Sequence, residues 1–211
     1  MGIPVLVYGK SGCGKSTAMR NFSENEILLC KVVNKPNPFR KQFKYTLSTD
    51  NIEKIKEKLK AMPCKAAVVD DAGYLMTDLF MNMKSANNFD KFDKIAQVMW
   101  TLFNFVIYDL PADVVVYIIM HEDVDDSGNT KPLTLGKLLD SKVNLAGMCT
   151  IALHAMRSAK NYVFRTQSDG FDIAKAPLDM FEAEEVPNDL KAVDTAIRDY
   201  YGFTDKKGQN K

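Results

Sequence analysis

A glycine-rich segment near the N-terminus carries the clearest chemical signal. It follows the apolar run Ile3 to Tyr8 and matches G-x-x-x-x-G-K-[ST] with Gly9, Lys10, Ser11, Gly12, Cys13, Gly14, Lys15, Ser16 and Thr17. The glycines let the backbone approach a phosphate chain closely and turn successive N–H groups toward it. Lys15 is placed to reach the β- and γ-phosphates, and the Ser16 hydroxyl is a ligand that suits Mg²⁺. This phosphate-binding loop therefore predicts a site for a nucleoside triphosphate, specifically ATP with Mg²⁺.

Two adjacent carboxylates form a second candidate feature. The apolar run Ala66 to Val69 ends in Asp70 and Asp71, and a strand ending in a carboxylate is typical of the residue that organises Mg²⁺. We assign Asp70 to the Mg²⁺ shell and expect Asp71 to orient or deprotonate the attacking water. Aspartate is shorter than the more usual glutamate, which favours slow turnover. The alternative for Asp71 is a helix N-cap ahead of Tyr74.

His121 directly follows another apolar run, Val114 to Met120. A polar residue there would lie beside the strand of the phosphate-binding loop and could sense the γ-phosphate. The alternative is a strand-end histidine bonded to a loop, and Glu122 competes for the same role. His154 lies inside an apolar run and is expected to be a satisfied core histidine. The thiol of Cys13 sits among N–H donors, which predicts a lowered pKa; the alternative is a small residue that fills the loop.

The elements that must position these residues alternate between strands and helices. Strands are expected at 3–8, 27–33, 41–47, 64–69, 114–120, 149–156 and 162–166, and helices at 15–22, 51–62 (capped by Asp50), 74–83, 92–108 and 189–201. Glu122 to Lys131 is expected to be a loop. This order predicts an α/β fold with a mostly parallel sheet and helices on both faces. We expect a single domain over 1–201 and a disordered polar tail over 202–211.

Composition narrows the possible partners. The 211 residues carry a net charge of +1, which excludes a globally basic nucleic-acid binder but allows a local basic patch. Arg40 to Tyr45 interleaves cations with aromatic residues, as a single-strand surface would, although a solvated edge strand explains it equally simply. The four cysteines form no C-x-x-C pair, so neither a zinc site nor a disulfide scaffold is expected. No apolar run approaches membrane-spanning length, and the expected location is the cytoplasm.

Four segments together resemble a known family. They are Tyr8 to Thr17, Val68 to Ala72, Tyr117 to Glu122 and Phe164 to Gly170, and they resemble phage-encoded AAA-type nucleotide-binding proteins. Part of that family is related to RecA-like single-strand annealing ATPases of phage recombination. The resemblance implies a RecA-like P-loop NTPase core, a homo-oligomeric ring or filament, single-stranded DNA as partner, and the cytoplasm of a bacterial host.

The resemblance also assigns roles to residues. It implies that Lys15 and Ser16 bind phosphate and Mg²⁺, that Asp70 serves the metal and that His121 takes the sensor position. Lys175 stands where related proteins place a basic residue that reaches the neighbouring subunit's nucleotide, but Ala176 follows instead of a second basic residue. RecA-type cores often carry a glutamate after the second strand, and 32–35 offers none.

These features predict an ATPase of phage DNA recombination or replication, slow or stimulated by DNA, with DNA-contacting loops at 82–94 and 122–137. A P-loop kinase for a nucleotide or small molecule is one alternative. The five arginines are scattered, whereas such kinases clamp the transferred phosphate with several. A nucleotide-switched assembly ATPase that does not bind DNA is the other alternative.

Overall fold

The computed structural model describes residues 1–83, 88–135 and 143–203. Its strands form a sheet in the order β3-β2-β4-β5-β1-β7-β8-β9, and β6 pairs with β5 outside this path. The strands are β1 (Ile3–Gly9), β2 (Ile27–Lys31), β3 (Tyr45–Ser48), β4 (Ala66–Asp70), β5 (Val115–Val124), β6 (Thr130–Pro132), β7 (Ile151–Ser158), β8 (Asn161–Arg165) and β9 (Glu185–Pro187). The ladders from β3 to β7 are parallel, while β6, β8 and β9 pair antiparallel. The mostly parallel α/β sheet of a P-loop NTPase core is confirmed.

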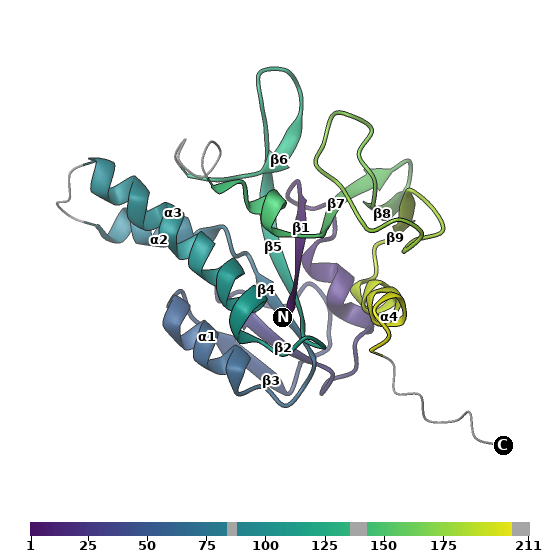
Figure 1. Ribbon diagram of the computed structural model, residues 1–211, viewed down its shortest axis with the longest axis horizontal. Coiled ribbons are helices and arrows are strands. Elements are labelled where there is room, and N and C mark those ends of the chain that lie inside the picture. Colours follow the sequence, from purple (N-terminus) through teal and green to yellow (C-terminus); the bar gives the residue numbers. More distant parts are fainter. Residues whose placement is uncertain (84–87, 136–142, 204–211) are drawn as a thin grey trace.

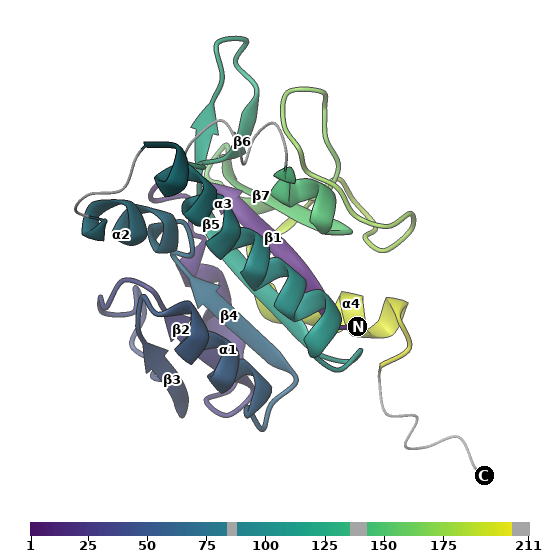
Figure 2. The same ribbon diagram turned by 60° about the vertical axis from the view of Figure 1, so that its left-hand side comes forward.

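Helices cover both faces of this sheet (Figures 1 and 2). One face packs against α1 (Ile52–Lys60), α2 (Tyr74–Asn82) and α3 (Asn88–Asn104), which continues into the π-turn η2 (Phe105–Asp109). The other face packs against the 3₁₀ helix η1 (Ser16–Asn21) and α4 (Leu190–Tyr200). A further 3₁₀ turn, η4 (Leu145–Met148), precedes β7. Because both faces are covered, β1, β4 and the first part of β5 are buried on both sides and read as continuous apolar runs.

The sheet order brings the predicted site residues to one edge. β5 lies between β1 and β4, and the register places His121, three residues before the end of β5, opposite Gly9, the last residue of β1. Asp70 ends β4 on the other side of β5. The phosphate-binding loop, the paired aspartates and His121 therefore start from neighbouring strand ends, as the parallel sheet predicts.

Two local predictions, the N-cap of α1 and the loop after His121, were wrong. The N-cap of α1 is Asn51 rather than Asp50, because the Asn51 side chain accepts from the N–H groups of Glu53 and Lys54. Residues 122–131 are not a plain loop, since β5 continues to Val124 and turns back into β6. The segment after the phosphate-binding loop is a 3₁₀ helix rather than an α-helix.

Some sequence predictions concern residues that the structure does not describe. The predicted DNA loop 82–94 overlaps the gap at 84–87, the second, 122–137, overlaps 136–142, and the tail beyond 203 lies outside the described residues. None of the described helices is long and apolar enough to cross a bilayer.

Candidate nucleotide-binding site

The phosphate-binding loop is held in a conformation that requires glycine. Gly12 and Gly14 have φ values of 79° and 91°, a region that side-chain-bearing residues rarely adopt. A Cβ on Gly14 would also lie 3.1 Å from both Tyr162 Cδ1 and Asn188 Oδ1. The loop backbone therefore packs directly against residues from the C-terminal third of the chain.

Lys15 points back into this loop. Its Nζ donates to the carbonyl oxygens of Gly9 at 2.6 Å and Lys10 at 2.7 Å, and the side chain is buried. Burial lowers the pKa of the ammonium group. The cation thus sits on the loop's own carbonyl groups, within the site where a phosphate chain would compete for it.

Ser16 and Asp70 form the link between the loop and β4. Ser16 Oγ donates to Asp70 Oδ1 at 2.9 Å, although the two residues are 54 positions apart. Burial, and then the charge of Asp71, raise the pKa of Asp70 to about 6. A hydroxyl and a buried carboxylate facing each other are the hard oxygen donors that Mg²⁺ prefers, together with waters and phosphate oxygens. The two predicted metal ligands are therefore adjacent, and the donor set fits Mg²⁺.

Asp71 faces the site rather than capping a helix. Helix α2 begins after Gly73 with no side-chain cap, so the N-cap alternative is not observed. Asp71 has a φ of 59° and is buried, and its carboxylate pairs with Lys35 Nζ. Its second oxygen lies 3.7 Å from His121 Nε2. Asp71 is thus held between one cation and one imidazole.

Lys35 is a site residue that the sequence analysis missed. It lies just beyond β2, where RecA-type cores often carry a glutamate and this chain has none. With Asp71, His121 and the phosphate-binding loop, Lys35 lines a cavity of about 250 Å³. The resemblance predicts a carboxylate at this position, whereas the structure places the ammonium group of Lys35 there.

His121 occupies the position predicted for a γ-phosphate sensor. Its ring lies edge-on to Tyr74, with 6.2 Å between centroids, and faces Asp71. Burial, and then the charge of Lys15, lower the pKa of His121, so the imidazole is neutral at pH 7. The backbone carbonyl of His121 also accepts from Leu133 N.

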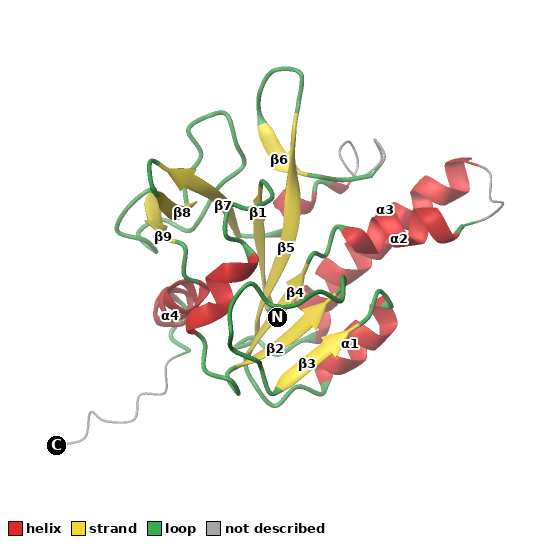
Figure 3. Ribbon diagram, turned by 180° about the vertical axis from the view of Figure 1, so that it is seen from behind, coloured by secondary structure: helices red, strands yellow, loops and turns green. Residues whose placement is uncertain are grey.

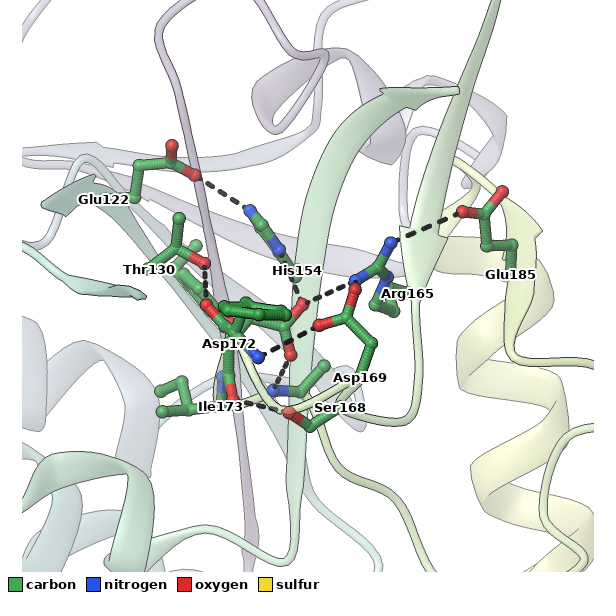
Figure 4. Close-up of polar contacts among 12 residues, drawn as sticks. Glu122, Thr130, His154, Arg165, Ser168, Asp169, Asp172, Ile173 and Glu185 are labelled. Atoms are coloured by element: carbon green, nitrogen blue, oxygen red, sulfur yellow. Dashed lines mark hydrogen bonds and ion pairs between the residues drawn. The ribbon is translucent and has the colours of Figure 1, made fainter. Parts of the chain in front are cut away.

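Glu122 contacts His154 (Figure 4). Its carboxylate lies 2.9 Å from His154 Nε2, and His154 Nδ1 lies 3.0 Å from Asp172. His154 is buried and stacks on Tyr8 with ring centroids 4.8 Å apart, as predicted for a satisfied core histidine. Glu122 therefore contacts the core histidine through one oxygen, and its other oxygen lies 4.0 Å from Lys10 Nζ of the phosphate-binding loop.

The same network continues toward β9. Arg165 lies 3.4 Å from Asp172 and 3.9 Å from Glu185, and it also pairs with Asp169 (Figure 4). These contacts link Glu122 on β5 to Glu185 on β9, at the edge of the sheet. This network was not predicted, because its members are spread over 64 positions, from 122 to 185.

The pKa prediction for Cys13 was wrong. The thiol is buried, and burial raises its pKa despite the nearby charge of Lys15. The simpler interpretation, a small residue filling the loop, agrees with this environment. Lys175, assigned by resemblance to a neighbouring subunit's nucleotide, pairs through its backbone with Ala152 beside β7.

The fold and this site together define a P-loop nucleotide-binding protein. Residues 5–89 match the family of the viral superfamily 1 RNA helicase core domain. The match covers less than half of the chain and includes the phosphate-binding loop, Lys35, Asp70 and Asp71, but not His121. No curated protein matches the chain. The similarity points to a helicase-like, NTP-hydrolysing core.

Proposed function

We propose that this protein is a Mg²⁺-dependent, RecA-like ATPase of phage DNA recombination or replication that acts on single-stranded DNA. The observation that carries the ATPase part is the contact between Ser16 and Asp70, which joins the phosphate-binding loop to the strand that ends in the paired aspartates. The similarity of 5–89 to a viral helicase core supports an NTPase that works on nucleic acid.

The residues of this chain divide the work of hydrolysis. Ser16 and Asp70 would hold Mg²⁺, which when bound supplies positive charge to the phosphate oxygens. Lys15 exchanges the carbonyl oxygens of Gly9 and Lys10 for phosphate oxygens. Asp71 orients the attacking water and accepts its proton, while neutral His121 contacts the γ-phosphate. Catalysis in such a site rests on positioning and charge stabilisation.

The tip of the α2–α3 pair supports a single-strand surface. Phe80 and Phe92 stack with ring centroids 6.2 Å apart, and Lys91 Nζ lies 5.7 Å from the Phe80 ring. Both rings are exposed. Aromatic faces beside a cation are how sequence-independent proteins hold unpaired bases. The predicted DNA loop 82–94 includes the end of α2 and the start of α3 in the structure, so it is largely not a loop. Of the two predicted DNA segments, it has the better chemistry.

The other candidate surfaces are weaker. The β5–β6 hairpin carries Asp123, Asp125 and Asp126 near its turn, and these charges repel a phosphate backbone. In the basic stretch 40–45, Lys41 Nζ is bound to the carbonyl oxygens of Arg20 and Phe22. That lysine supports the loop before β3 rather than a ligand.

Steady-state ATP hydrolysis should be measured with and without single-stranded DNA, at low and moderate salt. Lys15→Ala is the inactive control, and single-stranded RNA is a second arm because the matched family is named for RNA. We expect Lys15→Ala to abolish turnover and DNA to raise the wild-type rate. Unchanged ATP affinity in Lys15→Ala would overturn the site. Indifference to both nucleic acids would remove the DNA part and favour a nucleotide-switched assembly ATPase.

We also propose that the chain self-associates into a ring or filament. Trp100 on α3 and Tyr108 on η2 are both exposed, Tyr108 to 76 %, and large exposed aromatic side chains are typical of subunit contacts. Light scattering with and without ATP tests this. A monomer at all concentrations and nucleotide states would contradict it.

A further inference from the structure

A large cavity opens beside the phosphate-binding loop, on the side away from Asp71. Its volume is about 850 Å³, within the range of small-molecule sites. The loop and η1 contribute Gly12, Gly14, Thr17 and Arg20, and the opposite wall comes from β8, β9 and Asn188. It shares Gly12, Gly14 and Thr17 with the cavity that holds Asp71 and His121. One elongated ligand can therefore occupy both across the loop.

The position of this cavity follows from the sheet order. β4 and β5, which carry Asp70 and His121, lie on one side of β1, and β7, β8 and β9 lie on the other. Figure 3 shows β8 and β9 beside α4, at the edge opposite β3. A triphosphate with its terminal phosphate near His121 would therefore extend its other end toward β8 and β9.

Tyr162 gives the cavity an aromatic wall. Its side chain is 46 % exposed, and its ring edge packs on Gly14 of the loop. The guanidinium of Arg157 lies 5.3 Å from the ring centroid. Arg157 lines a neighbouring cavity and not this one, whereas Tyr162 lines this one. One ring face is therefore covered by Arg157, and the other is left for the cavity.

The remaining wall residues are suited to a neutral heterocycle. Pro187 and Val186 supply apolar surface. Asn188 is 3 % exposed, and its amide nitrogen has no hydrogen-bond partner among the described residues. Arg20 fixes this position, because its guanidinium donates to the carbonyl oxygens of Thr17 at 3.2 Å and Asn188 at 2.9 Å.

The charged residues of the cavity wall indicate which end of the ligand lies at the loop and which lies at β9. The loop end of the cavity offers N–H groups and Arg20, whereas Glu185 lies at the β9 end. A carboxylate repels phosphate and accepts hydrogen bonds from ribose hydroxyls or an exocyclic amine. Phosphates therefore belong at the loop, and the uncharged nucleoside belongs at β9.

We propose that this cavity binds the nucleoside half of the triphosphate, with the base stacked on Tyr162 and the polar edge of the base or ribose facing Asn188 and Glu185. The inference rests on the proposed function, because it takes the phosphates to lie in the loop. It assigns base recognition to 161–188, a segment outside the residues that match the helicase core.

The test compares ATP with inorganic tripolyphosphate, which has the phosphates but no base. Binding of each with Mg²⁺ is measured by calorimetry for the wild type, Tyr162→Ala and Tyr162→Phe. Tyr200→Ala is the matched control, because Tyr200 is also 46 % exposed but lies on α4 outside this cavity. We expect Tyr162→Ala to weaken ATP binding by about 5- to 150-fold, the range of one base–aromatic stack. Tripolyphosphate affinity should stay within about twofold, and Tyr162→Phe should retain ATP binding.

Two results would overturn the inference. Equal weakening of both ligands by Tyr162→Ala would make Tyr162 a support for the loop at Gly14, and no change in ATP binding would place the base elsewhere. If Tyr162→Ala does not fold, photolabelling of the wild type with 8-azido-ATP shows which peptides lie beside the base. Label in 161–188 supports the proposed site, and label confined to peptides outside 161–188 contradicts it. Failure of the proposed function gives a different result, because tripolyphosphate binding would then be insensitive to Lys15→Ala.

Discussion

The pair between Lys35 and Asp71 predicts a measurable coupling energy in the nucleotide-free protein. Lys35→Ala would leave Asp71, which is 4 % exposed, beside the equally buried Asp70 without its closest cation. Two unit charges 4 Å apart interact by about 4 kcal/mol at an effective dielectric constant of 20. Lys35 is 46 % exposed, so solvent screening reduces the expected loss to about 1–2 kcal/mol.

A double-mutant cycle read by urea unfolding measures this energy. Lys35→Ala should lower the free energy of unfolding by about 1–2 kcal/mol in the wild-type background. In the Asp71→Asn background the same change should cost less than about 0.5 kcal/mol, because no buried charge is left unpaired. The exposed pair Lys65–Asp113, 2.9 Å apart, is the matched control and should couple by at most about 0.5 kcal/mol.

A coupling for Lys35–Asp71 no larger than that of the control would refute the reasoning. The same variants separate structure from catalysis. If Asp71 handles the attacking water, Asp71→Asn should lower kcat by about 100-fold or more, the usual contribution of a positioned base, with little change in ATP affinity. A kcat within a few-fold of the wild type would remove Asp71 from the mechanism.

Three further predictions follow from the site. Gly14→Ala should destabilise the protein by about 1–3 kcal/mol through its positive φ and its contacts with β8, and a thermal melt with wild-type Tm would contradict this. The lowered pKa of His121 means that the folded protein holds that proton less tightly than the unfolded chain. The contribution of His121 to stability should therefore be lost as pH drops below about 6.5, whereas the raised pKa of Asp70 acts in the opposite sense, so His121→Gln should lose less stability than the wild type over that range in urea titrations. Burial raises the pKa of all four cysteine thiols, so a thiol reagent at pH 8 should titrate less than one group quickly in the native protein and four after unfolding. A Cys13 thiol that reacts quickly in the native protein would instead support the prediction that its pKa is lowered.

The sheet and the core of the site could be predicted because the signals are local. A strand buried on both faces is a continuous apolar run, and a P-loop is contiguous in sequence, so β1, β4 and β5 were located with their functional ends. Parallel pairing then brings those ends together without any knowledge of side-chain packing. The contact between Ser16 and Asp70 also depends on the strand order, in which only β5 separates β1 from β4.

Lys35, Tyr162 and Asn188 could not be found in this way, because their place depends on tertiary contacts. Lys35 follows a strand like many surface lysines, and only the position of Asp71 makes it part of the site. Tyr162 and Asn188 meet the loop at Gly14 through β8 and the turn after β9, and β9 is only three residues long. The pKa of Cys13 was misjudged because nearby N–H donors are visible in the sequence, whereas burial is not.

β5 is held in the sheet over its first part and extends out of it over its last part. Its first six residues are fully buried in the sheet, whereas its last two are exposed, and residues 122–124 pair with β6 alone outside the central path. The β5–β6 hairpin projects from the body of the protein (Figure 1). Val124 lies about 10 Å past His121 at ordinary strand rise. A small rotation of the strand at His121 would therefore be amplified at the turn, while the contact of Glu122 with His154 opposes it. If the proposed contact between His121 and the γ-phosphate rotates β5, the turn of the β5–β6 hairpin would therefore move, and a partner at that surface could detect the movement.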